Sequence, residues 1–255
     1  MGPVRYLFLA SAVYGMAAFP AMLLPVAPLR AASLQVAEDV PVDLELILAV
    51  DASSSVSSEE FDLQMRGLAE AFRNPLVGAA IRAMGDRGAV VSLVQWAGNR
   101  KQVQVIDWQI VRDEAEAEAL AALIDRSGRQ MVGGGTAIGS LIQYGMNQIA
   151  RNGYSGKRKV IDISGDGRTN QGAYPSNYRD RAVAEGVTVN GLAILNEDPN
   201  VDRYYRSQVI AGTGAFVMSA TTYEDFSAAM LEKLLKEIAG TPIARLLQIP
   251  ADSDS

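Results

Sequence analysis

Five oxygen-bearing side chains in three short segments could together hold a divalent cation. In chain order they are Asp51, Ser53, Ser55, Thr136 and Asp166. Two carboxylates and three hydroxyls form a hard-oxygen donor set of low charge. Such a set suits Mg²⁺ or Mn²⁺ that keeps part of its water, and Ca²⁺ also prefers oxygen ligands. The residue types therefore predict an oxygen-ligated metal site.

The composition excludes most other site chemistry. The chain has no cysteine and no histidine, which removes thiolate and imidazole nucleophiles, disulfides and the usual zinc ligand sets. It carries 29 acidic and 23 basic residues, for a formal net charge of −6. Nucleic-acid binding depends on clustered positive charge that releases counterions, so we expect no nucleic-acid partner.

The elements that precede the candidate ligands would bring them to one edge of a sheet. An apolar run at 44–50 predicts a strand that ends at Asp51, and a run at 159–164 predicts a strand that ends just before Asp166. Thr136 follows three glycines and precedes an apolar helical pattern. Open α/β sheets bind ligands beyond the carboxyl ends of their strands. We therefore expect the three segments to meet there.

Beyond residue 40 the chain alternates short β-branched runs with longer amphipathic stretches, which is typical of βαβ units. The runs at 88–96 and 102–108 predict an antiparallel hairpin at the edge of the sheet. Further strands are expected at 187–195 and 215–219, and helices at 57–73, 113–125, 138–149, near 178–185, near 202–211 and at 223–238. The predicted fold is α/β, a doubly wound, mostly parallel, Rossmann-like sheet with one antiparallel edge strand and helices on both faces.

The same motifs resemble the metal-ion-dependent adhesion site of von Willebrand factor A domains, in particular those of exported bacterial proteins. The pattern is D-x-S-x-S after the first strand, a later Gly-Gly-Thr and an Asp after a Ser-Gly turn, and the resemblance covers roughly residues 42–238. It implies that Ser53, Ser55 and Thr136 contact the cation through hydroxyls, while Asp51 and Asp166 act nearby, largely through water. It also implies that a protein partner adds an Asp or Glu carboxylate.

The function expected from this resemblance is cation-dependent protein binding, in adhesion or assembly, without enzymatic activity. One alternative is a structural envelope component whose metal only stabilises loops, and another is a metal-assisted hydrolase. No His, Cys or Lys stands beside the serines at 53–55 to activate a nucleophile. The glycine-rich turn at 133–139 resembles that of short-chain dehydrogenases, but it follows a charged stretch instead of a strand. A haloacid-dehalogenase-like phosphatase would need an Asp at the position of Ser53.

The first residues of the chain predict export. Arg5 precedes an apolar run at 6–29, and small residues follow at 31–33. Residues 1–32 are therefore interpreted as a signal peptide or a retained N-terminal anchor, residues 42–239 as one domain and residues 240–255 as a polar C-terminal tail. We expect a periplasmic or secreted protein that touches the membrane only through the N-terminal segment, if that segment is retained.

Asp162 interrupts an apolar strand that should be buried on both faces. It either pairs with a nearby Arg or Lys, or accepts hydrogen bonds behind the metal site. The first interpretation, a structural pairing, is favoured.

Overall fold

The computed structural model describes residue 2 and residues 38–240, and residues 38–240 are built around one six-stranded sheet. The strand order is β3-β2-β1-β4-β5-β6. All neighbouring strands are parallel except β2 and β3, which form the antiparallel hairpin at one edge. The strands are β1 Val40–Asp51, β2 Ala89–Trp96, β3 Gln102–Val111, β4 Tyr154–Gly165, β5 Val187–Ile194 and β6 Val217–Ala220. The predicted fold class is confirmed.

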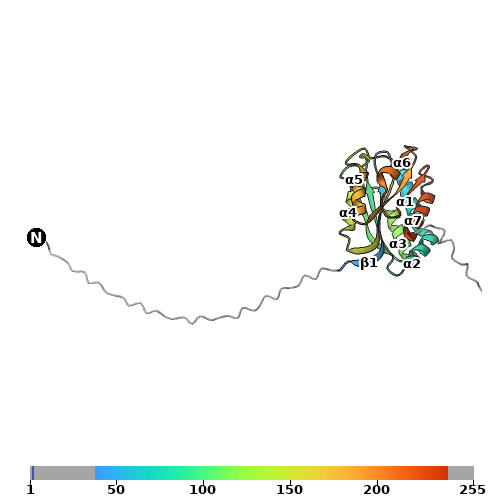
Figure 1. Ribbon diagram of the computed structural model, residues 1–255, viewed down its shortest axis with the longest axis horizontal. Coiled ribbons are helices and arrows are strands. Elements are labelled where there is room, and N and C mark those ends of the chain that lie inside the picture. The colour runs from blue at the N-terminus through green and yellow to red at the C-terminus, as the bar shows by residue number, and fades with distance from the viewer. Residues whose placement is uncertain (1, 3–37, 241–255) are drawn as a thin grey trace, which may run out of the picture. The chain divides into compact units, whose positions relative to one another are not determined.

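Helices cover both faces of this sheet (Figure 1). One layer contains α1 Ser58–Arg73, α2 Pro75–Met84, α3 Glu114–Arg126 and α7 Phe226–Ala239. The other contains α4 Ile138–Ile149, α5 Pro175–Ala184, α6 Val201–Tyr204 and a π-helical turn at Tyr205–Val209. Each layer packs its own buried apolar core against the sheet, so the central strands are covered on both sides.

Strand β1 shows how the sequence produces this two-layer arrangement. Leu46 and Leu48 belong to the core under α1 and α7, whereas Ile47 and Ala49 belong to the core under α4. Successive side chains of a strand point to opposite faces, so a continuous apolar run buries both faces. Because β1 lies between β2 and β4, its last residue, Asp51, stands in the middle of the carboxyl edge.

Several elements differ from expectation. β4 begins at Tyr154, earlier than the apolar run, because its polar first residues pair with the start of β1. α1 ends at Arg73, as expected, but a second helix follows at once, since Asn74 Oδ1 accepts from Leu76 N at 3.0 Å and Pro75 suits a first helical position. The prediction of a single helix near 202–211 is wrong, because α6 ends at Tyr204 and a π-helical turn follows at Tyr205–Val209.

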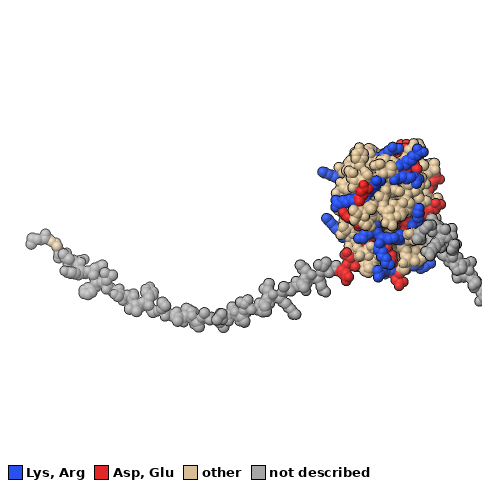
Figure 2. Space-filling view, viewed as in Figure 1, with Lys and Arg blue, Asp and Glu red and all other residues tan. Residues whose placement is uncertain are grey.

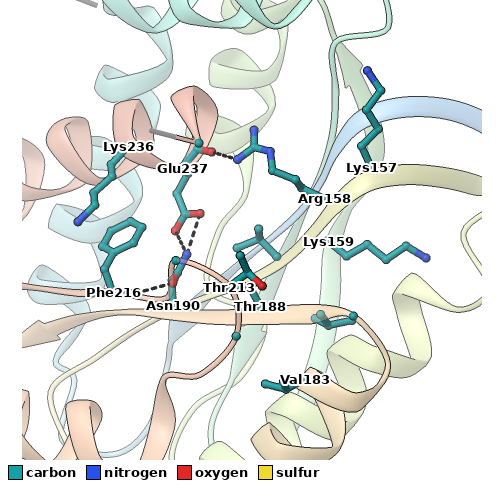
Figure 3. Close-up of a pocket in the computed structure, with 16 residues that line it drawn as sticks. Lys157, Arg158, Lys159, Val183, Thr188, Asn190, Thr213, Phe216, Lys236 and Glu237 are labelled. Atoms are coloured by element: carbon teal, nitrogen blue, oxygen red, sulfur yellow. Dashed lines mark hydrogen bonds between the residues drawn. The ribbon is translucent and has the colours of Figure 1, made fainter. Parts of the chain in front are cut away.

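Asp162 is buried and forms an ion pair with Lys233 of α7, so the structural interpretation is confirmed. Lys233 Nζ also lies 2.9 Å from Glu237 Oε1, and Asn190 of β5 donates to both Glu237 oxygens at 2.9 and 3.0 Å (Figure 3). Burial raises the pKa of Asp162 to about 6, although the neighbouring Lys233 opposes this. The network attaches α7 to β4 and β5.

A cavity of about 790 Å³ lies at the opposite edge of the sheet from Asp51. It is lined by residues 157–160 of β4, by the first residues of β5 and by the last turn of α7. Phe216 and Lys236 lie beside it (Figure 3). The cavity therefore does not include any of the predicted metal ligands.

Within residues 38–240 no helix is long and apolar enough to cross a membrane. The predicted leader at 1–32, apart from Gly2, and the tail beyond Gly240 lie outside the described residues.

Candidate metal centre

The loops after β1 and β4 are adjacent because these strands are parallel neighbours, with Val50 paired to Ser164. The register places Asp51 beside the turn that carries Asp166. Ser55 Oγ donates to Asp166 Oδ1 at 2.9 Å, and the hydroxyls of Ser53 and Ser55 lie 3.2 Å apart. These two loops thus bring four of the five predicted ligands together.

Thr136 reaches the same place from the loop before α4. Its backbone N–H donates to Asn170 Oδ1 at 2.8 Å, and its carbonyl accepts from Asn170 N at 2.9 Å. A Cβ added at Gly167 would lie 3.4 Å from Thr136 Oγ1, so the threonine hydroxyl lies against the residue that follows Asp166. All five predicted side chains therefore come together at the carboxyl edge.

The glycines before Thr136 allow its loop to pair with the loop after β1. Ser54 N donates to the Gly134 carbonyl at 3.0 Å, and Gly134 N donates to Ser54 Oγ at 2.9 Å. Gly133 and Gly134 adopt φ values of 69° and 117°, in the range that residues with a Cβ rarely adopt. Glycine is thus needed at these positions to hold the two loops in register.

Asp51 is fully buried, and its two carboxylate oxygens are in different situations. Oδ1 accepts from Ser53 N at 2.7 Å, whereas Oδ2 has no hydrogen-bond partner among the described residues. Burial, and then the nearby charge of Asp166, raise the pKa of Asp51 to about 7. A buried carboxylate oxygen without a partner is energetically costly, and a bound cation would remove that cost.

Gly165 makes room for this carboxylate. A Cβ at this position would lie 2.8 Å from Asp51 Oδ2, 2.8 Å from the Tyr205 hydroxyl and 3.0 Å from Trp96 Cζ2. The Tyr205 hydroxyl is itself buried without a hydrogen-bond partner among the described residues. Any side chain at position 165 would therefore displace Asp51 or the aromatic residues behind it.

Asp166 is held from both sides. Oδ1 accepts from Ser55, and Oδ2 accepts from the Tyr223 hydroxyl at 3.0 Å. Burial raises the pKa of Asp166, while the hydrogen bonds from Ser55 and Tyr223 act in the opposite direction. Its carboxylate is consequently oriented by two elements that are far apart in the chain.

Sequence reasoning did not identify Tyr223 or Arg129 as parts of the site. Arg129 donates to the carbonyls of Ala52 and Ser53 at 2.9 and 3.0 Å, and its guanidinium lies 5.4 Å from the centroid of the Phe61 ring. It thereby fixes the backbone of the first ligand loop. Neither residue belongs to a local motif, so no signal in the sequence could have identified them.

The donor set as a whole fits a hard divalent cation. No cluster of three or more acidic side chains suited to a metal occurs in the described part of the chain, so such a cation would depend on hydroxyl ligands. The hydroxyls of Ser53 and Ser55 bond only to each other and to Asp166 among the described side chains. Mg²⁺ and Mn²⁺ bind such oxygens while keeping several waters.

Comparisons with known proteins agree with this architecture. Residues 41–242 match the family model described as "Protein of unknown function (DUF1194)". A search of the curated proteins found no match. One similar solved structure is proximal thread matrix protein 1 from the mussel byssus with a zinc-occupied MIDAS motif, 19% identical with a TM-score of 0.54 over 79% of this chain and 49% of that chain.

Two similar structures come from pili. The pilus adhesin SpaC from Lactobacillus rhamnosus GG is 12% identical, with a TM-score of 0.54 over 79% of this chain and 30% of that chain. The vWF domain of the type V pili tip protein Mfa5 from Porphyromonas gingivalis is 11% identical, with a TM-score of 0.54 over 84% of this chain and 98% of that chain. This chain spans about half the length of the mussel protein. The chain belongs to the DUF1194 family, and its fold is that of a von Willebrand factor A domain.

Proposed function

We propose that this chain is an exported protein-binding module, for adhesion or assembly, that depends on a divalent cation and receives a carboxylate from its partner. The observation that carries the proposal is the buried, unpartnered Oδ2 of Asp51, next to a hydroxyl-rich cluster at the sheet edge. Unpaired buried carboxylate oxygens are rare in folded proteins unless a ligand or ion satisfies them. Mg²⁺ is the proposed ion, with Mn²⁺ or Ca²⁺ as substitutes.

In this proposal Ser53, Ser55 and Thr136 contact the cation through their hydroxyls. Asp51 and Asp166 stand close to it and act largely through water. Hydroxyl ligands are neutral, so the ion stays short of negative charge and attracts a carboxylate from outside. The ion supplies Lewis acidity, and the chain's own residues supply its position.

The hydrogen bonds of the serines support binding over catalysis. Ser55 Oγ donates to Asp166, and Ser53 Oγ bonds to Ser55. No Lys or Arg of the described chain hydrogen-bonds to either hydroxyl, so a base that could activate them is not in place. We therefore propose that the protein is not an enzyme.

Export is proposed from the N-terminal segment. Arg5, the apolar run at 6–29 and the small residues after it form a signal that directs the protein to the periplasm or out of the cell. The structurally similar SpaC and Mfa5 are a pilus adhesin and a pilus tip protein, which supports an extracytoplasmic binding role.

The test compares Thr136→Ala with Thr213→Ala, which removes the same hydroxyl and methyl groups from an exposed threonine at the opposite edge of the domain. Each full chain is used to capture partners from the native cell envelope in Mg²⁺, followed by elution with chelator. We expect Thr136→Ala to reduce capture about tenfold or more. Its melting temperature should change little, because the backbone contacts to Asn170 remain. Thr213→Ala should behave like the wild type.

Two results would contradict the proposal. Capture that is insensitive to chelator and to Thr136→Ala would place the partner elsewhere on the domain. Stabilisation by Mg²⁺ without any chelator-released protein would instead favour the structural component whose metal only stabilises loops.

A further inference from the structure

Three segments beside Thr136 form one connected surface, here called the loop platform: residues 97–101, 131–136 and 168–174. Lys101 Nζ donates to the Gly133 carbonyl at 3.0 Å, and Asn99 N donates to Gln171 Oε1 at 3.2 Å. The Thr136 carbonyl accepts from the backbone N–H groups of both Asn170 and Gln171. Because each segment is bonded to another, the platform is preorganised around the metal edge.

The loop platform carries the two most exposed large apolar side chains in the described part of the chain. Val132 is 81% exposed and Tyr174 is 72% exposed. A single exposed apolar residue is ordinary on a protein surface. These two, however, stand on the segments that hold Thr136 in place. Exposed tyrosines such as Tyr174 are frequent anchors of binding surfaces.

The charge of the loop platform is opposite to that of the chain. Its three segments contain Arg100, Lys101 and Arg168 and no Asp or Glu, whereas the whole chain has a net charge of −6. Arg168 is paired with Asp198 at 2.6 Å, but Arg100 is exposed and has no ion-pair partner among the described residues. Figure 2 shows Lys and Arg side chains at the upper end of the domain, and others at its side and lower end, with Asp and Glu among them. The platform thus suits an acidic partner.

We propose that the loop platform binds a protein segment whose metal-directed Asp or Glu is flanked by aliphatic or aromatic residues. The flanking side chains pack on Val132 and Tyr174, and Arg100 attracts further acidic groups of the same segment. This inference rests on the proposed function, since the carboxylate is the group that the cation receives. It adds that apolar neighbours, and not the acidic residue alone, determine which partner is accepted.

The test uses libraries of short peptides with a fixed central Asp and randomised neighbours, selected on the immobilised full chain in Mg²⁺. Selection on wild type is compared with selection on the double variant Val132→Ser/Tyr174→Ser. The matched control is Leu76→Ser, which changes a 54%-exposed residue of α2 at the opposite end of the domain. All three side chains are exposed, so the melting temperatures should stay close to that of wild type.

We expect the wild type and Leu76→Ser to enrich peptides with apolar residues next to the Asp. The double variant should lose this preference, with affinity for the selected peptides lower by about tenfold or more, the usual effect of truncating interface anchors. Mg²⁺-dependent enrichment of acidic peptides without an apolar preference, or a preference that survives in the double variant, would overturn this inference and leave the proposed function intact. Absence of any Mg²⁺-dependent binding of the Asp peptides would overturn both.

Discussion

The hydroxyl of Tyr223, in the turn before α7, donates to Asp166 Oδ2 at 3.0 Å and so joins the last helix to the candidate metal site. Burial raises the pKa of Tyr223 far above its ordinary value, and the charge of Asp166 adds to this effect. The phenol therefore stays protonated and acts as a donor. Asp166 in turn has both oxygens occupied, one by Tyr223 and one by Ser55.

Tyr223→Phe tests this connection. Removing the hydroxyl leaves Asp166 oriented by Ser55 alone, so we expect Mg²⁺ to raise the melting temperature less than in wild type, but still measurably. The free energy of unfolding should fall by about 1.5–3 kcal/mol, the usual range for a hydrogen bond to a charged group. Tyr174→Phe, at an exposed tyrosine, is the control and should change neither quantity. Equal Mg²⁺ responses in both variants would show that Tyr223 does not orient the site.

Asp51→Asn should separate metal binding from metal-free stability. Asp51 has a pKa of about 7 in the folded chain against an ordinary value of 3.8, so the folded state holds a proton that the unfolded state has released. Wild-type stability without metal should therefore decrease as the pH rises from about 4 to about 7. Asn keeps the acceptor for Ser53 N and has no charge to bury.

At neutral pH, metal-free Asp51→Asn should be more stable than wild type, by up to about 4 kcal/mol. It should also lose the Mg²⁺-dependent rise in melting temperature. Asp166→Ala should lose the same rise without the gain in stability, because it removes the acceptor of two side-chain hydrogen bonds. Calorimetry with Mg²⁺, with Mn²⁺ and with chelator measures each case. Wild-type responses to the cation in both variants would refute the assignment of the site.

Lys233→Met tests the buried network on the other side of α7. Burial lowers the pKa of Lys233, but Asp162 and Glu237 outweigh this effect, so its pKa is raised and it stays charged. Without the lysine, two buried carboxylates face each other with no cation between them, so the pKa of Asp162 rises further. The folded state then favours protonation, so stability should fall as the pH increases. We expect a loss of about 3–5 kcal/mol near neutral pH and less near pH 5.

Lys236→Met is the matched control, because Lys236 lies over the Phe216 ring and not in the buried network. It should cost less than about 1 kcal/mol at either pH. Denaturant unfolding at both pH values gives the comparison. A pH-independent loss in Lys233→Met would mean that Asp162 does not titrate in the measured range.

Processing of the leader is a separate prediction from the N-terminal sequence. Arg5, the apolar run at 6–29 and the small residues that follow predict removal of the segment on export. Mass spectrometry of the protein isolated from the cell envelope or the medium should find a mature chain that begins near residue 32. An intact Met1 in a cytoplasmic fraction would contradict export, and an intact Met1 in the membrane fraction would indicate a retained anchor.

Short-range patterns in the sequence determined the main elements and the five candidate ligands. The apolar run before Asp51 and the turn between β2 and β3 each depend on residues only a few positions apart. Carboxyl ends of parallel strands share an edge, so the sequence alone predicts that the ligand loops lie together. The lengths of β1 and β4 could not be read in this way, because their polar ends are held by backbone pairing and not by side-chain pattern.

Only the tertiary structure decided which distant side chains complete and support the site. Tyr223 meets Asp166 across 57 positions, and Arg129 reaches the carbonyl of Ala52 across 77. Such contacts depend on strand order and on how helices pack against the sheet, and neither leaves a periodic signal in the chain. Lys233, likewise, cannot be distinguished in the sequence from the other residues of an amphipathic helix. Its role follows only from the packing of α7 over Asp162. Local periodicity and caps determine elements, whereas long-range packing determines which of their side chains meet.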